Sequence, residues 1–151
     1  MPKAAPKIRS PQPDRPAKGD AIEVSAVFPV APQALYKAWL SSKEHSAFTG
    51  GDAVVDPRKG GKFMAWDGYI SGVTLELAPG RRIVQAWRAT DFPKGAKDSL
   101  LEVLFEKAAG GTKVTLRHTQ IPAGRGESYK QGWKEFYFTP MRKHYAGGAR
   151  A

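Results

Sequence analysis

DPRKGGKF at residues 56–63 opens a run of predicted β-strands, and YKQGW at residues 129–133 opens the long helix that closes the chain. Between these stretches, turn-forming residues recur at 57–61, 67–68, 79–80, 93–95 and 110–111. Glycine, proline and aspartate favour turns because they supply a positive φ, a fixed φ or a bond to their own backbone. The spacing predicts six antiparallel strands between Asp52 and about Ile121.

The segment before these strands predicts one more strand and two short helices. Apolar residues alternate with others from Ala21 to Phe28, as in a half-buried strand. Pro32 suits the first turn of a helix, and Ser41 followed by Glu44 is typical of a helix N-cap. Gly50-Gly51 ends the second helix by allowing positive φ.

Alternation within the strands assigns their faces. The residues predicted to face the core are Val73, Leu75, Leu77, Leu101, Val103 and Phe105. The residues predicted to face outward are Arg88, Glu102, Glu106 and Arg117. Glu102 and Glu106 are therefore not a catalytic pair.

The terminal helix is predicted over residues 127–145, with an aromatic stripe of Tyr129, Trp133, Phe136 and Tyr137. Pro140 should break or kink this helix near residues 136–139, because proline lacks the N–H that bonds the preceding turn. We expect the helix to lie across a curved antiparallel sheet of six to seven strands, an arrangement that commonly encloses a hydrophobic cavity. The predicted fold class is α+β.

The 151 residues predict one domain, over residues 21–145. Residues 1–20 are interrupted by prolines and hold few apolar side chains, so we expect a disordered, basic arm. Residues 146–151 should be a disordered tail.

The formal net charge is +10, from 24 Lys and Arg against 14 Asp and Glu, which raises nucleic acid as a partner. The basic residues outside the arm form no run, and the aromatic residues follow core positions without interleaving with them. This pattern argues against nucleic-acid binding and favours a solvated basic face.

The chain has no cysteine, which excludes disulfides and sulfur-ligated zinc. It also lacks an apolar run of the length of a signal peptide or a membrane span. We therefore expect a cytoplasmic protein.

A further signal is the order and spacing of particular residues from Val24 to Tyr145. They are Phe28, Tyr36, Trp39, Asp56-x-Arg58-x-Gly60-Gly61-x-Phe63, Gly72, Pro79, Trp87, Phe105, Gly111-Thr112, His118 and Gly132-Trp133. In this pattern the chain resembles the family related to the C-terminal domain of the activator of the 90-kDa heat-shock chaperone ATPase. That family lies within the START-like (SRPBCC, Bet v 1-like) superfamily.

The resemblance implies a helix-grip fold whose cavity usually holds a hydrophobic ligand. It also implies a heat-shock chaperone as an alternative partner. In the eukaryotic co-chaperone a separate N-terminal domain supplies much of the chaperone contact, and we expect the short Pro-rich arm to stand in its place here.

The candidate ligand-binding residues are aromatic and apolar side chains of the predicted sheet and helices. Plain core packing is the alternative for each of them. They are Trp39, Phe63, Trp66, Trp87, Val103, Phe105, Leu116, His118, Trp133, Phe136 and Tyr137.

His118 shares the inward face of the last strand with apolar neighbours, where it could act as acid, base or ligand anchor, or be a hydrogen-bonded structural residue. His45 and His144 have no partner at metal-ligand spacing, so no metal site is predicted. Gly60-Gly61 beside Arg58 could cradle a phosphate, but no nucleotide motif is present and a hairpin is favoured. No catalytic constellation and no cofactor are predicted.

The sequence therefore predicts a carrier or sensor that binds a small hydrophobic molecule: a lipid, sterol, flavonoid or polyketide-like compound. A co-chaperone-like regulator and a polyketide cyclase or aromatase-like enzyme remain alternatives. We expect a monomer or a weak dimer.

Overall fold

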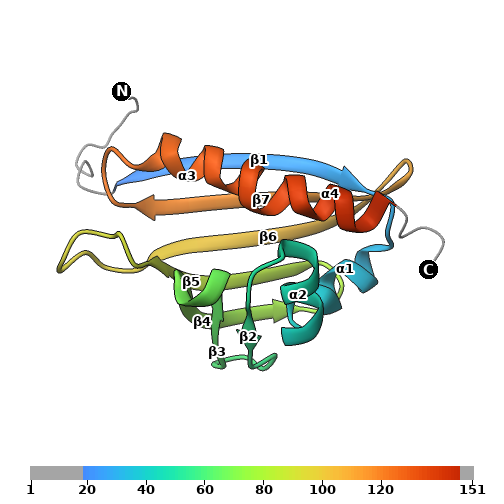
Figure 1. Ribbon diagram of the computed structural model, residues 1–151, viewed down its shortest axis with the longest axis horizontal. Helices are drawn as coiled ribbons and strands as arrows, with labels where there is room; N and C mark the ends of the chain where they lie inside the picture. Colours follow the sequence, from blue (N-terminus) through green and yellow to red (C-terminus); the bar gives the residue numbers. More distant parts are fainter. Residues whose placement is uncertain (1–18, 147–151) are drawn as a thin grey trace.

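The computed structural model describes residues 19–146, and most of the predicted arm and tail lies outside this range. Seven antiparallel strands form one sheet in the order β1-β7-β6-β5-β4-β3-β2 (Figure 1). The strands are β1 (Asp20–Phe28), β2 (Val54–Val55), β3 (Lys62–Ala65), β4 (Ile70–Ala78), β5 (Arg82–Ala89), β6 (Ser99–Ala108) and β7 (Gly111–Ile121). The predicted α+β helix-grip fold is confirmed.

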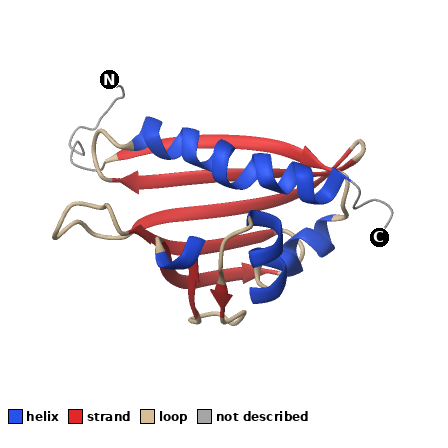
Figure 2. Cartoon of the chain, viewed as in Figure 1, coloured by secondary structure: helices blue, strands red, loops and turns tan. Residues whose placement is uncertain are grey.

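The helices gather on one side of the sheet (Figure 2). The terminal helical segment contacts β1 through α3 and α4, and α2 packs against both α1 and α4. The helices are α1 (Pro32–Trp39), α2 (Ser42–Thr49), the short 3-10 turn η2 (Trp66–Gly68), α3 (Gly126–Trp133), the π-helical turn η3 (Lys134–Phe138) and α4 (Thr139–Ala146).

The predicted signals for the two short helices are confirmed. Pro32 occupies the first turn of α1. Ser41 caps α2 by accepting a hydrogen bond from the backbone N–H of Glu44 at 3.1 Å. Gly50 ends α2 with φ of 90°, a conformation that glycine adopts without steric cost.

The predicted faces are confirmed for β6 and wrong for part of β4. Leu101, Val103 and Phe105 belong to the core, whereas Leu75 is 40% exposed and the neighbouring Thr74 is fully buried. The register changes at this point, because Thr74 pairs with Gln85 and Glu76 pairs with Val84. The extra residue is a β-bulge that reverses the alternation.

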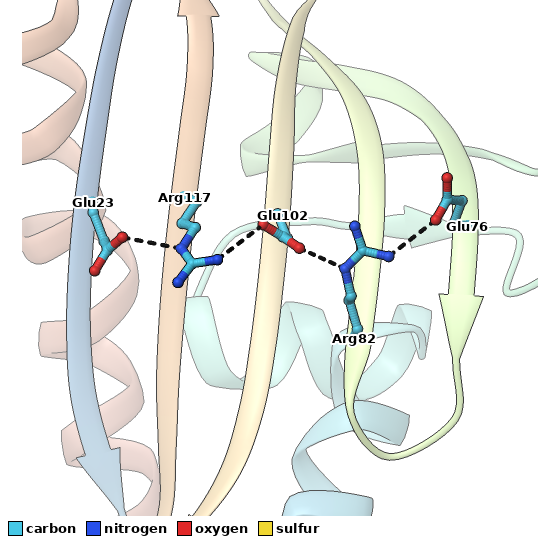
Figure 3. A network of polar contacts seen from close by, with 5 residues as sticks. All are labelled: Glu23, Glu76, Arg82, Glu102 and Arg117. Carbon is cyan, nitrogen blue, oxygen red and sulfur yellow. Dashed lines mark hydrogen bonds and ion pairs between the residues drawn. The ribbon is translucent and has the colours of Figure 1, made fainter.

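The outer face of the sheet carries a ladder of alternating charges that crosses five adjacent strands (Figure 3). Arg117 binds Glu23 at 3.0 Å and Glu102 at 3.6 Å, and Arg82 binds Glu102 at 2.5 Å and Glu76 at 3.0 Å. The predicted outward positions of Glu102 and Arg117 are confirmed.

The terminal helix continues past Pro140 without a break, but it is irregular just before this proline, where a break or kink was predicted. The irregularity is the π-helical turn at Lys134–Phe138, directly before α4. Because Pro140 has no N–H, it cannot donate to the carbonyl oxygen of Phe136, four residues earlier. That oxygen instead accepts a hydrogen bond from the indole Nε1 of Trp66, at 3.2 Å.

Candidate ligand pocket

A pocket of about 320 Å³ lies between the terminal helix and the part of the sheet formed by β4 and β5. Most of its wall is aromatic. It is lined by Trp66, Tyr69, Ile70, Trp87, Ser128, Tyr129, Gly132, Trp133, Phe136 and Tyr137. Tyr69, Ser128 and Phe136 are exposed, so they lie where the pocket meets solvent.

The structure brings some of the predicted binding residues to this pocket and leaves the others in the core. Trp66, Trp87, Trp133, Phe136 and Tyr137 line the pocket. The remaining candidates are buried in the hydrophobic core away from the pocket wall, or, for His118, behind it: Trp39, Phe63, Val103, Phe105, Leu116 and His118.

Several lining residues were not predicted as binding residues. Tyr129 and Gly132 share a helical face with Trp133 and Phe136, so the spacing of the predicted aromatic stripe could have indicated them. Tyr69, Ile70 and Ser128 carry no comparable signal, because their position depends on how η2 and α3 meet in space.

His118 lies behind the pocket wall and is connected by hydrogen bonds to two wall residues, Trp133 and Trp87. Its Nδ1 accepts the indole N–H of Trp133 at 3.0 Å, so its Nε2 carries the proton and donates to the Ser99 hydroxyl at 2.8 Å. The Ser99 hydroxyl in turn donates to the carbonyl oxygen of Trp87 at 2.9 Å. Burial lowers the pKa of His118 to about 3, which keeps the ring neutral.

His45 holds Tyr137 in a similar way. Its Nδ1 lies 2.9 Å from the carbonyl oxygen of Trp39 and must donate to it, so Nε2 accepts the hydroxyl of Tyr137 at 2.7 Å. Burial lowers the pKa of His45 to about 4. The sequence did not indicate the hydrogen bond between His45 and Tyr137, because the two residues are 92 positions apart in the chain.

The Trp66 indole closes one side of the pocket from a rarely used backbone conformation. Trp66 has φ of 49° and Asp67 has φ of 59°, in the left-handed region that bulky residues avoid. The Trp66 ring lies against Gly51, where an added Cβ would be 2.5 Å from the ring, and stacks edge-on with Phe136.

A carboxylate stands at the polar end of this aromatic wall. Asp91 accepts the hydroxyl of Tyr69 on Oδ2 at 2.9 Å and the hydroxyl of Tyr129 on Oδ1. Arg125 donates to the backbone oxygen of Asp91. Burial and the bond to Asp91 raise the pKa of the Tyr129 phenol, which therefore stays protonated.

Residues 19–146 hold neither a metal-binding cluster nor a membrane-spanning helix. No cluster of three or more His, Cys, Asp or Glu residues in that range could hold a metal ion. None of the helices there is long and apolar enough to cross a membrane.

The family model of the Activator of Hsp90 ATPase homolog 1-like proteins matches residues 29–145. The chain belongs to this family. The activator of 90 kDa heat shock protein ATPase homolog 1 from Homo sapiens is 31% identical over 129 residues, or 85% of this chain and 38% of the human protein. The chain thus spans well under half the length of this relative. The resemblance predicted from the sequence is confirmed.

Two solved structures have a similar fold. An HSP90 activator from Plasmodium falciparum has a TM-score of 0.71 and 27% identity, over 80% of this chain and 92% of that chain. An Aha1 dimer from Colwellia psychrerythraea has a TM-score of 0.69 at 13% identity, over 83% of this chain and 96% of that chain. The second likeness is of fold alone.

Proposed function

We propose that the protein binds a small, flat, apolar molecule in the pocket beneath the terminal helix, as a carrier or sensor. The observation that supports this most is the pocket itself, about 320 Å³ with a wall formed mostly of aromatic rings. Ligand sites are commonly apolar concavities of this size with a few polar groups. The indoles of Trp66, Trp87 and Trp133 line the pocket, and aromatic rings of this kind favour contact with a planar ligand.

The way the walls are held also supports binding. Trp133 and Tyr137 are each bound to a buried histidine, and Trp66 is bound to the terminal helix. A ligand entering such a pocket pays little to order these side chains. The core behind the pocket is filled, so the ligand would occupy this lateral space and not the whole interval between sheet and helix.

An NMR titration of the isotope-labelled protein tests the proposal. The panel contains fatty acids, flavonoids, sterols and aromatic polyketide mimics. We expect saturable shifts in the indole N–H signals of Trp66, Trp87 and Trp133, with the Trp39 signal, which comes from outside the pocket, as the internal control. If every compound left the three signals unchanged, the proposal would be abandoned.

Regulation of a heat-shock chaperone ATPase is the second candidate. It is supported by the 31% identity to the human activator over 129 residues. In this case a surface of the domain, not the pocket, would contact the chaperone. The purified protein should then co-purify with a 90-kDa heat-shock chaperone and raise its ATP turnover; unchanged turnover without co-purification would remove this candidate.

A further inference from the structure

The hydrogen-bonding character of the pocket is set by Asp91, which lies next to the wall. Tyr69 donates to Oδ2 of Asp91 at 2.9 Å, and Tyr129 donates to Oδ1. An ionised carboxylate can only accept hydrogen bonds, so both phenol protons are directed toward it. Toward any other partner, the two phenol oxygens can then act only as hydrogen-bond acceptors.

Two indole N–H groups of the wall are also committed. The Trp66 N–H bonds the Phe136 carbonyl oxygen and the Trp133 N–H bonds His118. The Trp87 indole makes no side-chain hydrogen bond within residues 19–146, and the rings of Phe92, His118, Tyr129 and Trp133 surround it. The two tyrosines therefore offer acceptor oxygens and no donors to the pocket, whereas within residues 19–146 the Trp87 N–H and the Ser128 hydroxyl of other lining residues keep their protons free.

We infer that the ligand is a planar aromatic molecule with a hydroxyl group, and that this hydroxyl donates to the oxygen of Tyr129 or Tyr69. Asp91 is a positioning residue, because it acts through the two tyrosines by holding their protons away from the pocket. This inference rests on the proposed function and narrows it to one chemical class among the ligands considered there.

The arrangement disfavours anionic ligands. A ligand carboxylate at this end would face two acceptor oxygens with no proton to offer, and the charge of Asp91 just beyond them. The guanidinium of Arg125 donates through Nη1 to the Asp91 backbone oxygen, and its positive charge lies near Tyr69, so an anionic probe has to be included in the test. A neutral phenol instead stacks on the indoles and supplies the missing donor.

Calorimetric titration with four probes tests the inference: naphthalene, 2-methoxynaphthalene, 2-naphthol and 2-naphthoate. The methoxy probe keeps the ring and an acceptor oxygen but lacks the donor. The quantity of interest is the affinity ratio of 2-naphthol to 2-methoxynaphthalene, because the solvation of the probes cancels when this ratio is compared between protein variants.

In Asp91→Asn the side chain can accept from one tyrosine and must donate to, or leave, the other. One phenol proton then becomes available to the pocket, so the affinity ratio should fall roughly three- to tenfold, as expected for one exchanged hydrogen bond. Tyr129→Phe, which removes an acceptor oxygen, should lower the ratio in the same direction. Asp98→Asn is the matched control, since Asp98 lies in the same loop but pairs with Arg88.

Each outcome decides between the two proposals. An unchanged ratio in Asp91→Asn, or 2-naphthoate as the tightest probe, overturns the inference while leaving a ligand pocket in place. Failure of all four probes to bind the wild-type protein overturns the inference and counts against the proposed function as well. The inference is supported if the affinity ratio of 2-naphthol to 2-methoxynaphthalene falls in Asp91→Asn and Tyr129→Phe but stays at the wild-type value in Asp98→Asn.

Discussion

The indole N–H of Trp133 donates to Nδ1 of His118 at 3.0 Å, joining the terminal helix to β7 inside the core. This bond decides which nitrogen of His118 is protonated, and through Ser99 it reaches the backbone of Trp87 on β5. The position of two pocket walls therefore depends on a histidine that does not line the pocket.

Replacing Trp133 with Phe should destabilise the domain. Phenylalanine keeps a ring at the site but leaves Nδ1 of His118 buried without a donor, which costs about 1 to 3 kcal/mol. Urea unfolding at neutral pH measures this loss. Phe136→Leu on the same helix is the control, because Phe136 is 53% exposed and its replacement should cost less than about 1 kcal/mol. Equal urea midpoints for Trp133→Phe and wild type would contradict the prediction.

Stability should fall as the pH is lowered from about 6.5 toward 3. The pKa of His118 is lowered to about 3 and that of His45 to about 4, whereas an unfolded histidine titrates at 6.5. The unfolded chain therefore binds protons first as the pH falls. Across this window each histidine lowers the free energy of unfolding by on the order of 3 kcal/mol. At neutral pH the stabilisation is fully present.

Unfolding curves at several pH values in that window test this prediction. His118→Gln and His45→Gln should each reduce the slope of stability against pH. His144→Gln should not change the slope, because His144 is exposed near the end of α4. Identical slopes for all three variants and the wild type would show that the buried histidines do not control acid stability.

Residue 132 should set the size of the pocket. A Cβ built at Gly132 meets no atom within 4 Å, so alanine fits there and should stabilise the helix by about 0.5 to 1 kcal/mol. Gly132→Leu should keep the fold and weaken binding of 2-naphthol by filling the pocket. Thermal unfolding and calorimetric titration measure the two effects.

Gly51→Ala is the contrasting variant. Its Cβ would lie 2.5 Å from the Trp66 ring, so it should destabilise the protein and displace that indole.

The prediction for residue 132 is contradicted if a folded Gly132→Leu protein binds 2-naphthol as tightly as the wild type, because the ligand would then lie elsewhere.

Pro140→Ala should weaken the hydrogen bond that the Trp66 indole donates to the terminal helix. Alanine supplies an N–H four residues after Phe136, which would compete with the indole of Trp66 for the Phe136 carbonyl oxygen. Hydrogen exchange of the Trp66 indole N–H, followed by NMR, should become faster. The Trp133 indole N–H, which bonds His118, should exchange as in the wild type.

The fold was predictable wherever the signal is local. Turn residues predicted the six strands after Asp52, and the capping of α2 by Ser41 followed from its spacing to Glu44. The bulge at Leu75 was not predictable, because the run from Val73 to Leu77 alternates perfectly in the sequence and only the pairing with β5 reveals the extra residue.

The pocket was less predictable than the fold. Aromatic periodicity in the terminal helix indicated Trp133 and Tyr137, but it could not distinguish a residue that lines a pocket from one that fills the core. Asp91 was missed because its role depends on Tyr69 and Tyr129, which lie 22 and 38 residues away in the chain. Contacts of this range depend on the completed sheet and helix.

The charge ladder on the outer face has a consequence for how the chain reaches this structure. Glu102 and Arg117 stand opposite each other in the β6–β7 register, and Arg117 also stands opposite Glu23 of β1. A slip of β7 by one residue would turn Arg117 toward the core and His118 toward solvent. A hairpin with the shifted register would lose these ion pairs and bury a charge, so it would be less stable than the native pairing. The ladder therefore favours the correct strand register, even though each exposed pair adds little to the stability of the folded protein.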